Sequence, residues 1–390
     1  MKKIIIIGPT YPYRGGNSLF VSFLYELLYK EYEVKIYNYK LLYPQILFPG
    51  KTQYDLSQDV KKIESVRILN SINPFSWVKV ARKINKENPD LIIFDWWHPF
   101  FSFCHFGISS LLKKELKKRV VFITENIVSH EKNLFENILT KIGLFNSKYF
   151  IVLSKQVENE LRKFFRDRKI YRSELPIYSH LKTNLSQKNE ARKKFNLDEN
   201  DNVILFFGYV RKYKGLDILI ESLSLLLKSQ PQLNIKLLVA GEFYEDKKFY
   251  LDLIERLNLK NRILIFDEYI PNEKVKDFFI ASDLVVLPYR SATQSGILNL
   301  SYGFSKPVVI TNVGGLAEFV IPDRTGIIAN ESTPDSISKA IKQFFELRKD
   351  IDFEKNIEEY CQKNNFNNFN RIISDVLNDI DKNFKSKINS

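Results

Sequence analysis

Short hydrophobic runs alternate with longer amphipathic stretches through both halves of the chain. In the first half, a run at 3–8 precedes a periodic stretch at 17–30. In the second half, a run at 203–207 precedes a periodic stretch at 215–228. Buried runs of this length followed by helical periodicity are typical of parallel sheets with helices on both faces. The pattern therefore predicts two tandem, Rossmann-like, doubly wound α/β domains.

One polar, asparagine-rich stretch, TNLSQKNEARKKFNLDENDN, separates the two series. It predicts a linker at 184–202 between an acceptor-binding domain at 1–183 and a nucleotide-sugar-binding domain at 203–365. The polar, helical segment 366–390 predicts a closing helix that packs back toward the first domain. A length of 390 residues suits two domains, and two such domains place a ligand cleft between the carboxyl ends of their sheets.

Composition indicates a protein of a reducing compartment. The two cysteines, Cys104 and Cys361, match no metal-ligand spacing and predict unpaired thiols. No signal peptide is evident, because the chain enters its first strand directly after Lys3. The segment 91–112 has one charged residue and nearly the length of a membrane span. Because Pro99 and Gly107 interrupt it, we expect a strand, an aromatic loop and a helix.

A net charge of +13 and a pI near 9.3 suggest an anionic partner. No nucleic-acid-binding motif accompanies the charge, so we expect an anionic membrane surface and an anionic substrate instead. The segment LRKFFRDRKIYR at 161–172 is a candidate for membrane contact. The alternative is a helix with one wet face and two core phenylalanines. We expect a cytoplasmic protein, peripheral on the inner face of the plasma membrane.

The candidate chemistry concentrates at the start of the second domain. A buried strand ends at Gly208, a basic turn with Arg211 and Lys214 follows, and Gly215 opens a helix. A glycine turn at a helix N-terminus binds anions through its free N–H groups and the helix dipole. Two fixed cations suit a diphosphate. The alternative is an ordinary strand–helix unit with solvated cations.

An ordered set of motifs resembles the retaining glycosyltransferases of family 4, within the glycosyl transferases group 1, which have the two-domain GT-B fold. The second half contains, in order, G-x-x-R-x-x-K-G (208–215), LLVAGE (237–242), YIPNEKVKDFFIASDLVVLPY (269–289), TQSGILNLSYGFSKPVVIT (293–311) and GGLAEFVIPDRTG (314–326). The first half contains PTYPYRGGNSLFVSFLYELL (9–28) and TENIVSHE (124–131). The resemblance covers nearly the whole chain.

The resemblance implies sugar transfer from a nucleoside diphosphate-sugar, with retention, to a glycan or lipid-linked acceptor in surface polysaccharide synthesis. Cations would stabilise the departing diphosphate, so no metal ion or other cofactor is expected. The expected catalytic residues are Arg211, Lys214 and His130. The expected donor-binding residues are Gly15, Gly16, Gly208, Glu242, Ile270, Thr293, Gln294, Ser295, Gly296 and Ile297. The expected acceptor-side residues are Trp96, Trp97 and Asn126.

Four alternatives remain open in the sequence. Many family members carry two glutamates where this chain has Thr293 and Ser301. A sugar-nucleotide-binding relative without catalysis is therefore one alternative, and a non-transferring enzyme such as a nucleotide-sugar epimerase is another. His130 could be a surface residue, and one of Trp96 and Trp97 could belong to the core rather than to an acceptor pocket.

Overall fold

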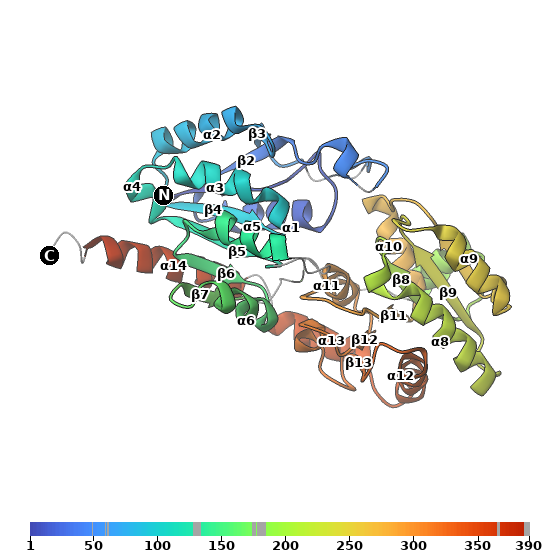
Figure 1. The fold of residues 1–390 in the computed structure, drawn as a ribbon. Coiled ribbons are helices and arrows are strands. Elements are labelled where there is room, and N and C mark those ends of the chain that lie inside the picture. Colours follow the sequence, from blue (N-terminus) through green and yellow to red (C-terminus); the bar gives the residue numbers. More distant parts are fainter. Residues whose placement is uncertain are drawn as a thin grey trace. The chain divides into compact units, whose positions relative to one another are not determined.

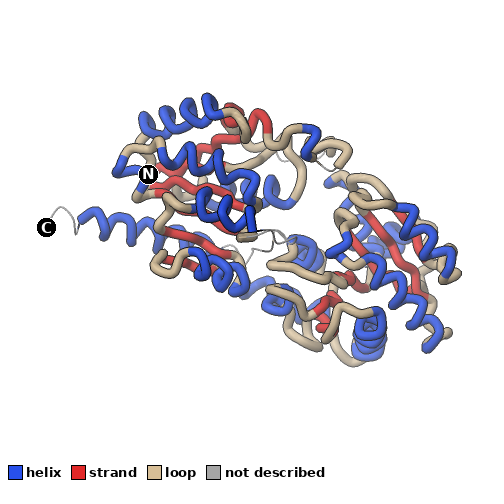
Figure 2. Tube along the Cα trace, in the orientation of Figure 1, coloured by secondary structure: helices blue, strands red, loops and turns tan. Residues whose placement is uncertain are grey.

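The computed structural model describes residues 1–48, 50–58, 60, 62–127, 134–173, 177, 185–364 and 367–385. The chain forms two compact α/β units, drawn in Figure 1 and by secondary structure in Figure 2. The first comprises Met1–Asp55, Val60–Leu175 and Phe366–Ser390. The second comprises Leu56–Asp59 and Pro176–Asn365. The prediction of two α/β domains with parallel sheets is confirmed.

The first unit is built on a seven-stranded parallel sheet of order β3-β2-β1-β4-β5-β6-β7. Its strands are β1 (Lys3–Ile7), β2 (Glu33–Leu41), β3 (Val66–Asn70), β4 (Leu91–Trp96), β5 (Val120–Thr124), β6 (Tyr149–Val152) and β7 (Lys169–Arg172). Its α-helices are α1 (Gly16–Leu28), α2 (Pro74–Glu87), α3 (Ser102–Ser110), α4 (Lys114–Lys117), α5 (Leu134–Leu144), α6 (Lys155–Phe164) and α14 (Asn367–Lys385).

Both faces of this sheet are covered, which explains its uninterrupted hydrophobic strands. One face packs against α2, α3, α5 and α6, and the other packs against α1 and α14. On α14, Phe369, Ile373 and Val376 are buried in the second of these clusters. The carboxylate of Asp379 accepts from Tyr171. The closing helix therefore completes the core of the first unit.

The second unit contains a six-stranded parallel sheet of order β10-β9-β8-β11-β12-β13. Its strands are β8 (Asn202–Phe207), β9 (Ile235–Ala240), β10 (Ile263–Phe266), β11 (Leu284–Leu287), β12 (Val308–Thr311) and β13 (Gly326–Ala329). Its α-helices are α7 (Leu185–Lys194), α8 (Leu216–Ser229), α9 (Lys247–Arg256), α10 (Asn272–Ala281), α11 (Gly296–Gly303), α12 (Pro334–Leu347) and α13 (Phe353–Lys363).

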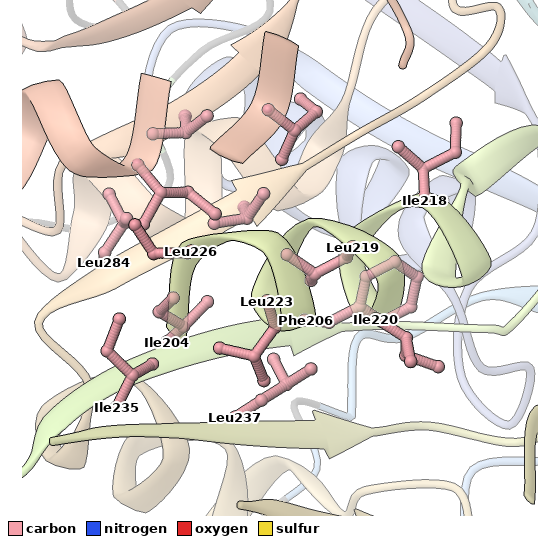
Figure 3. Close-up of a cluster of buried hydrophobic side chains, with 14 of the residues drawn as sticks. Ile204, Phe206, Ile218, Leu219, Ile220, Leu223, Leu226, Ile235, Leu237 and Leu284 are labelled. Carbon is pink, nitrogen blue, oxygen red and sulfur yellow. The ribbon is translucent and has the colours of Figure 1, made fainter. Parts of the chain in front are cut away.

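Alternate residues of β8 enter two different cores. Ile204 and Phe206 pack with Leu219 and Leu223 of α8, as Figure 3 shows. Leu205, on the opposite face, belongs to a cluster with residues of α10 and α11. Because both faces are buried, β8 is rigidly held, and the turn that follows it has a fixed position.

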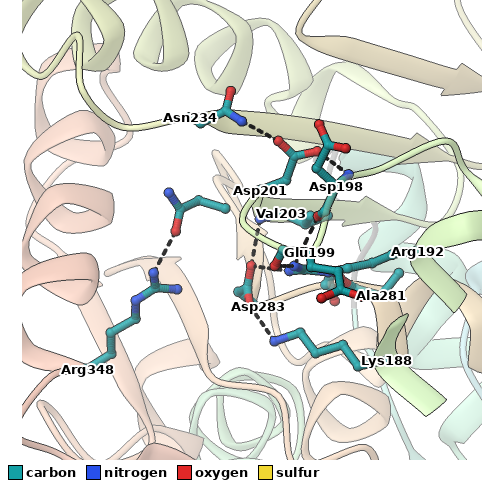
Figure 4. Close-up of polar contacts among 12 residues, drawn as sticks. Lys188, Arg192, Asp198, Glu199, Asp201, Val203, Asn234, Ala281, Asp283 and Arg348 are labelled. Carbon is teal, nitrogen blue, oxygen red and sulfur yellow. Dashed lines mark hydrogen bonds and ion pairs between the residues drawn. The ribbon is translucent and has the colours of Figure 1, made fainter. Parts of the chain in front are cut away.

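The segment predicted as a linker is instead packed into the second unit. Residues 185–194 form α7, and the Arg192 side chain is almost completely buried. Its guanidinium lies 2.9 Å from the carboxylate of Asp283, which also contacts Lys188 at 2.6 Å (Figure 4). Burial opposes ionisation of Asp283, but these two cations hold its pKa below the ordinary value. Polar composition suggested a linker, whereas the ion pairs make the segment structural.

Two segments with membrane-like features have other roles. Residues 91–112 form β4, a short turn and α3, and no helix within the described ranges is long and apolar enough to cross a membrane. In 161–172, Phe164 and Phe165 pack against the core of the first unit. The core alternative for these two phenylalanines is therefore correct.

Candidate functional site

The turn after β8 depends on two glycines with positive φ. Gly208 has φ 97° and Gly215 has φ 69°, a conformation that side chains disfavour. A Cβ on Gly215 would also collide with the carbonyl oxygen of Pro288. Between them, Lys212–Lys214 forms one 3-10 turn, and α8 begins at Leu216. The predicted strand–turn–helix arrangement is therefore present.

The Lys214 side chain is buried and aimed at Gly208. Its Nζ would lie 3.1 Å from a Cβ placed on Gly208, and only 8% of the residue is exposed. Within the described residues, this amino group has no carboxylate partner. Burial, together with the nearby positive charge of Arg211, lowers the pKa of Lys214 to about 8.

Arg211 lies on an aromatic platform at the same turn. Its guanidinium carbon is 4.9 Å from the centre of the Tyr244 ring. That ring stacks on Tyr209 with a centroid separation of 4.5 Å. A cation over an aromatic face is held by the ring quadrupole, so the platform restrains the guanidinium beside Lys214.

Contacts from the loops after β11 and β9 fix the turn. Arg290 forms a two-pronged ion pair with Asp217 at 2.9 and 2.7 Å, and it donates to the Lys212 carbonyl at 2.7 Å. The Lys212 N–H donates to the carboxylate of Glu245 at 2.5 Å. The Val210 N–H donates to the backbone carbonyl of Glu242 at 2.9 Å. These contacts therefore hold the turn that carries Arg211 and Lys214 in one position.

The N-terminus of α11 lies beside the same glycine. The Ile297 side chain would be 3.5 Å from a Cβ on Gly208. Ser295 caps the helix by accepting from the Leu298 N–H at 3.4 Å. Gly296 is exposed, with open space where a Cβ would lie. The amide oxygen of Gln294 is buried without a hydrogen-bond partner. The Lys214 amino group and the N-terminus of α11 therefore meet at Gly208, and Arg211 lies three residues further along the same turn.

The predicted donor residues Glu242, Thr293 and Ile270 are all largely buried. Glu242 and Thr293 are buried, with 3% and 6% of each residue exposed. The Ile270 side chain lies in a hydrophobic core cluster, so only its backbone could touch a ligand. Ser301 is completely buried, and its hydroxyl donates to the Ile297 carbonyl at 2.7 Å.

The first unit places the predicted glycines at the start of α1. Gly15 precedes the helix with φ 105°, and Gly16 has open space at its Cβ position. Trp96 is completely buried in the core of the first unit, which agrees with the core alternative left open for one of the two tryptophans. Trp97 packs on Phe101 and donates to the Tyr43 hydroxyl at 3.0 Å.

Two further predicted residues lie in the segment after β5. Asn126 is half-buried and has contacts of its own. His130 lies outside the described residues, so its role remains a prediction.

A buried carboxyl pair was not predicted as part of the site. Asp95 is the penultimate residue of β4, and both its carboxylate oxygens are buried without a hydrogen-bond partner in the described chain. Glu125 follows β5, the neighbouring strand, and its N–H donates to the Trp96 carbonyl at 2.9 Å. Burial and the charge of Glu125 raise the pKa of Asp95 well above its usual range. Burial raises the pKa of Glu125 to about 7, although hydrogen bonding with Asn17 opposes this shift.

The sequence did contain a signal for this pair. Asp95 is the only charged residue within 91–112. A single carboxylate at the end of a buried strand costs free energy unless it has a partner or a function.

Comparisons with known proteins agree with this geometry. Residues 187–364 match the family described as glycosyl transferases group 1. An uncharacterized glycosyltransferase of Methanocaldococcus jannaschii, MJ1178, is 27% identical over 373 residues, which is 93% of each chain. The structure of Anabaena HepE with UDP aligns with a TM-score of 0.74 at 16% identity, over 97% of this chain and 100% of that one.

Other solved structures have the same fold. HepE has also been solved with UDP-glucose, and this structure aligns with a TM-score of 0.71 at 15% identity over 99% of this chain and 100% of that one. WaaG, a glycosyltransferase involved in lipopolysaccharide biosynthesis, aligns with a TM-score of 0.64 at 16% identity over 92% of this chain and 95% of that one. The chain is therefore similar to the group 1 glycosyltransferases, and it has the GT-B fold.

Proposed function

We propose that this protein is a group 1 glycosyltransferase that transfers a hexose from a nucleoside diphosphate-sugar to a glycan or lipid-linked acceptor, with retention at the anomeric carbon. The observation that carries the proposal is the buried Lys214 amino group. It is aimed at Gly208 and has no carboxylate partner in the described residues. A buried cation is costly until an anion neutralises it. A diphosphate beside Gly208 supplies that anion.

The same arrangement supports catalysis without a metal ion. As the bond to the diphosphate breaks, negative charge grows on the leaving oxygens. Lys214 and Arg211 are fixed before the reaction, so they stabilise that charge without reorganising. The N–H groups at the start of α11 add partial positive charge on the other side of Gly208. These groups take the role that a divalent ion has in other sugar-transferring enzymes.

A uridine nucleotide is the proposed donor class, and a surface glycan is the proposed product. HepE, which has the same fold, has been solved with UDP and with UDP-glucose. WaaG acts in lipopolysaccharide biosynthesis. These relationships support a UDP-hexose donor and a role in surface polysaccharide synthesis at the cytoplasmic face of the membrane.

One observation favours a second candidate, a protein that binds the donor without transferring its sugar. The Ser301 hydroxyl is committed to the Ile297 carbonyl and is fully buried. Thr293 is also buried and carries no charge. Neither residue can supply the carboxylate contact that the family's glutamates make, so recognition of the sugar must use other groups.

The test is release of nucleoside diphosphate from a panel of UDP-hexoses, with and without extracted lipid-linked glycans as acceptors. We expect UDP to raise the melting temperature, because a ligand specific to the folded state stabilises it by mass action. We also expect acceptor-dependent release that persists in EDTA, and an α-linked product by NMR. UDP binding without release from any donor would support the binding protein. An inverted product would overturn retention.

A further inference from the structure

Exposed phenylalanines gather on one helix layer of the first unit. Among the described residues, five phenylalanines are more than half exposed, and four of them lie on or directly after α2, α3 and α5. These four are Phe75 (85% exposed), Phe103 (55%), Phe135 (61%) and Phe145 (59%). The fifth, Phe249 (54%), belongs to α9 of the second unit. Such a concentration of large apolar rings at a surface indicates an interaction site.

Helix α5 presents apolar side chains to solvent as well as to the core. Thr140 and Leu144 are buried against the unit. On the opposite side, Ile138 is 57% exposed, Ile142 is partly exposed, and Phe145 follows the helix end. Positions four and then three residues apart share one side of a helix. This outward stripe therefore cannot be explained by packing within the first unit.

Helix α5, which carries this stripe, packs directly against α3. The Asn146 amide donates to Ser109 and Ser110 at the end of α3, at 3.0 and 2.8 Å. A Cβ on Gly143 would lie 2.9 Å from the Ser102 Cα at the start of α3. Figure 1 shows α2, α3 and α5 along the same face of the sheet. Phe103 on α3 and Leu111 directly after it, which are also exposed, therefore belong to the element that packs next to α5.

The segment that contains α2, α3 and α4 is rich in positive charge. Between residues 74 and 119, the chain has nine lysines and arginines and four carboxylic residues. Of these four, Asp95 is completely buried, and Glu87 pairs with Lys35. Lys113 just before α4, Lys114 at the start of α4, and Lys141 on α5 are exposed. Aromatic rings among lysines match a lipid surface that has an apolar interior and anionic headgroups.

We propose that this surface, which we call the α3–α5 face and define by Phe103, Leu111, Ile138 and Phe145 with the surrounding lysines, binds an anionic lipid bilayer. The rings project from separate elements and are spread among charges, an arrangement that fluid headgroups accommodate. Each ring inserts among the acyl chains while the lysines contact phosphates. The proposal does not depend on sugar transfer, because none of these residues belongs to the donor-binding turn.

The test is flotation of the full chain with vesicles of phosphatidylcholine and phosphatidylglycerol, compared with vesicles of phosphatidylcholine alone. We expect binding to the anionic vesicles that weakens as salt rises. Phe103→Ser and Phe145→Ser should each weaken binding roughly tenfold, because each removes a large apolar group from the bilayer. The double change Lys113→Glu and Lys114→Glu should weaken binding further and reduce its dependence on salt.

Matched controls lie on α9 of the second unit. Phe249→Ser and Lys248→Glu alter an exposed ring and an exposed lysine of the same kinds, and they should leave vesicle binding unchanged. All variants should keep the wild-type melting temperature and UDP binding, which separates this proposal from the proposed function. Equal vesicle binding by Phe145→Ser and wild type would overturn it. Self-association that Phe145→Ser abolishes, without vesicle binding, would instead make the face a contact between two copies.

Discussion

At the scale of single residues, Lys214 and Arg211 carry the proposed chemistry. Arg211→Ala and Lys214→Ala should each lower turnover by about a hundredfold, as removal of one preorganised donor does in other enzymes. The double variant should lose less than the product of the two effects, because both cations act on one diphosphate. Nucleoside diphosphate release measured under saturating donor checks both expectations.

The stability of these variants distinguishes a role in binding from a role in folding. Lys214 is buried, and its pKa is lowered to about 8, so below that pH the free protein must hold a desolvated cation. Lys214→Met should therefore keep or raise the melting temperature at pH 7 while UDP no longer stabilises the protein. Near-normal turnover in all of these variants would mean that the basic turn is not a phosphate site.

The buried carboxyl pair predicts how stability depends on pH. Asp95 has a raised pKa in the folded state, and that of Glu125 is raised to about 7. The folded state therefore binds more protons than the unfolded state between the ordinary carboxyl pKa and these raised values. Stability should fall as pH rises through that window.

Asp95→Asn should reduce this fall and raise the melting temperature at pH 8 by about 3 °C or more. Glu115→Gln changes an exposed carboxylate of the same unit and serves as the control, with an unchanged pH profile. Calorimetry from pH 5 to pH 8 provides the comparison. A steeper fall in Asp95→Asn would show that the aspartate is ionised and stabilising.

At the scale of elements, α1 and α11 each begin with a glycine, and substituting these glycines tests whether the donor contacts the backbone at either helix N-terminus. Gly16 at the start of α1 and Gly296 at the start of α11 both have open space at the Cβ position and no positive φ. Gly16→Ala and Gly296→Ala should therefore fold normally. If a diphosphate or sugar approaches these backbones, each change should lower donor affinity by about tenfold or more.

A structural control is available at the basic turn. Gly215→Ala should lower the melting temperature, because its positive φ and the Pro288 carbonyl both exclude a side chain. Donor titrations of the three variants separate these effects. Unchanged affinity in Gly16→Ala would remove α1 from the donor site.

Element prediction from sequence succeeded where burial was uniform. The strands expected at 3–8 and 203–207 and the helices expected at 17–30 and 215–228 are present as β1, β8, α1 and α8, with bounds within two residues of those expected, because apolar runs and clear periodicity specify them. Strand β7 and helix α5 were missed. Helix α5 has apolar residues on its exposed side as well as on its buried side, so its sequence lacks the pattern of a simple amphipathic helix.

The candidate site was also predictable only in part. The turn from Gly208 to Gly215 was predictable because its glycines and cations are adjacent in sequence. The contacts of Arg290 with Asp217 and of Arg192 with Asp283 join residues that are far apart. Such pairing depends on the tertiary fold, so composition alone made the α7 segment look like a linker.

At the scale of the whole molecule, the chain order of the two units has a consequence for folding. The first unit is discontinuous, because its core includes α14 from the end of the chain. Phe369, Ile373, Val376, Leu377 and Ile380 of this helix are all buried. Each such side chain contributes about 1.5–3 kcal/mol when it leaves water. Their combined burial is comparable with the whole stability of a domain, about 5–15 kcal/mol.

A chain ending at Asn364 should therefore lose the cooperative unfolding of the first unit while the second unit, whose cores lie within 185–364, still unfolds cooperatively. Ile373→Asp makes the same test with one side chain, since it buries a charge at a fully covered position. Asn378→Asp adds the same charge at an exposed position of α14 and should leave the calorimetric profile unchanged. Calorimetry combined with limited proteolysis follows each unit separately. If the truncated chain retained both transitions, α14 would be an accessory to the first unit, and its buried apolar face would contribute little to that unit's stability.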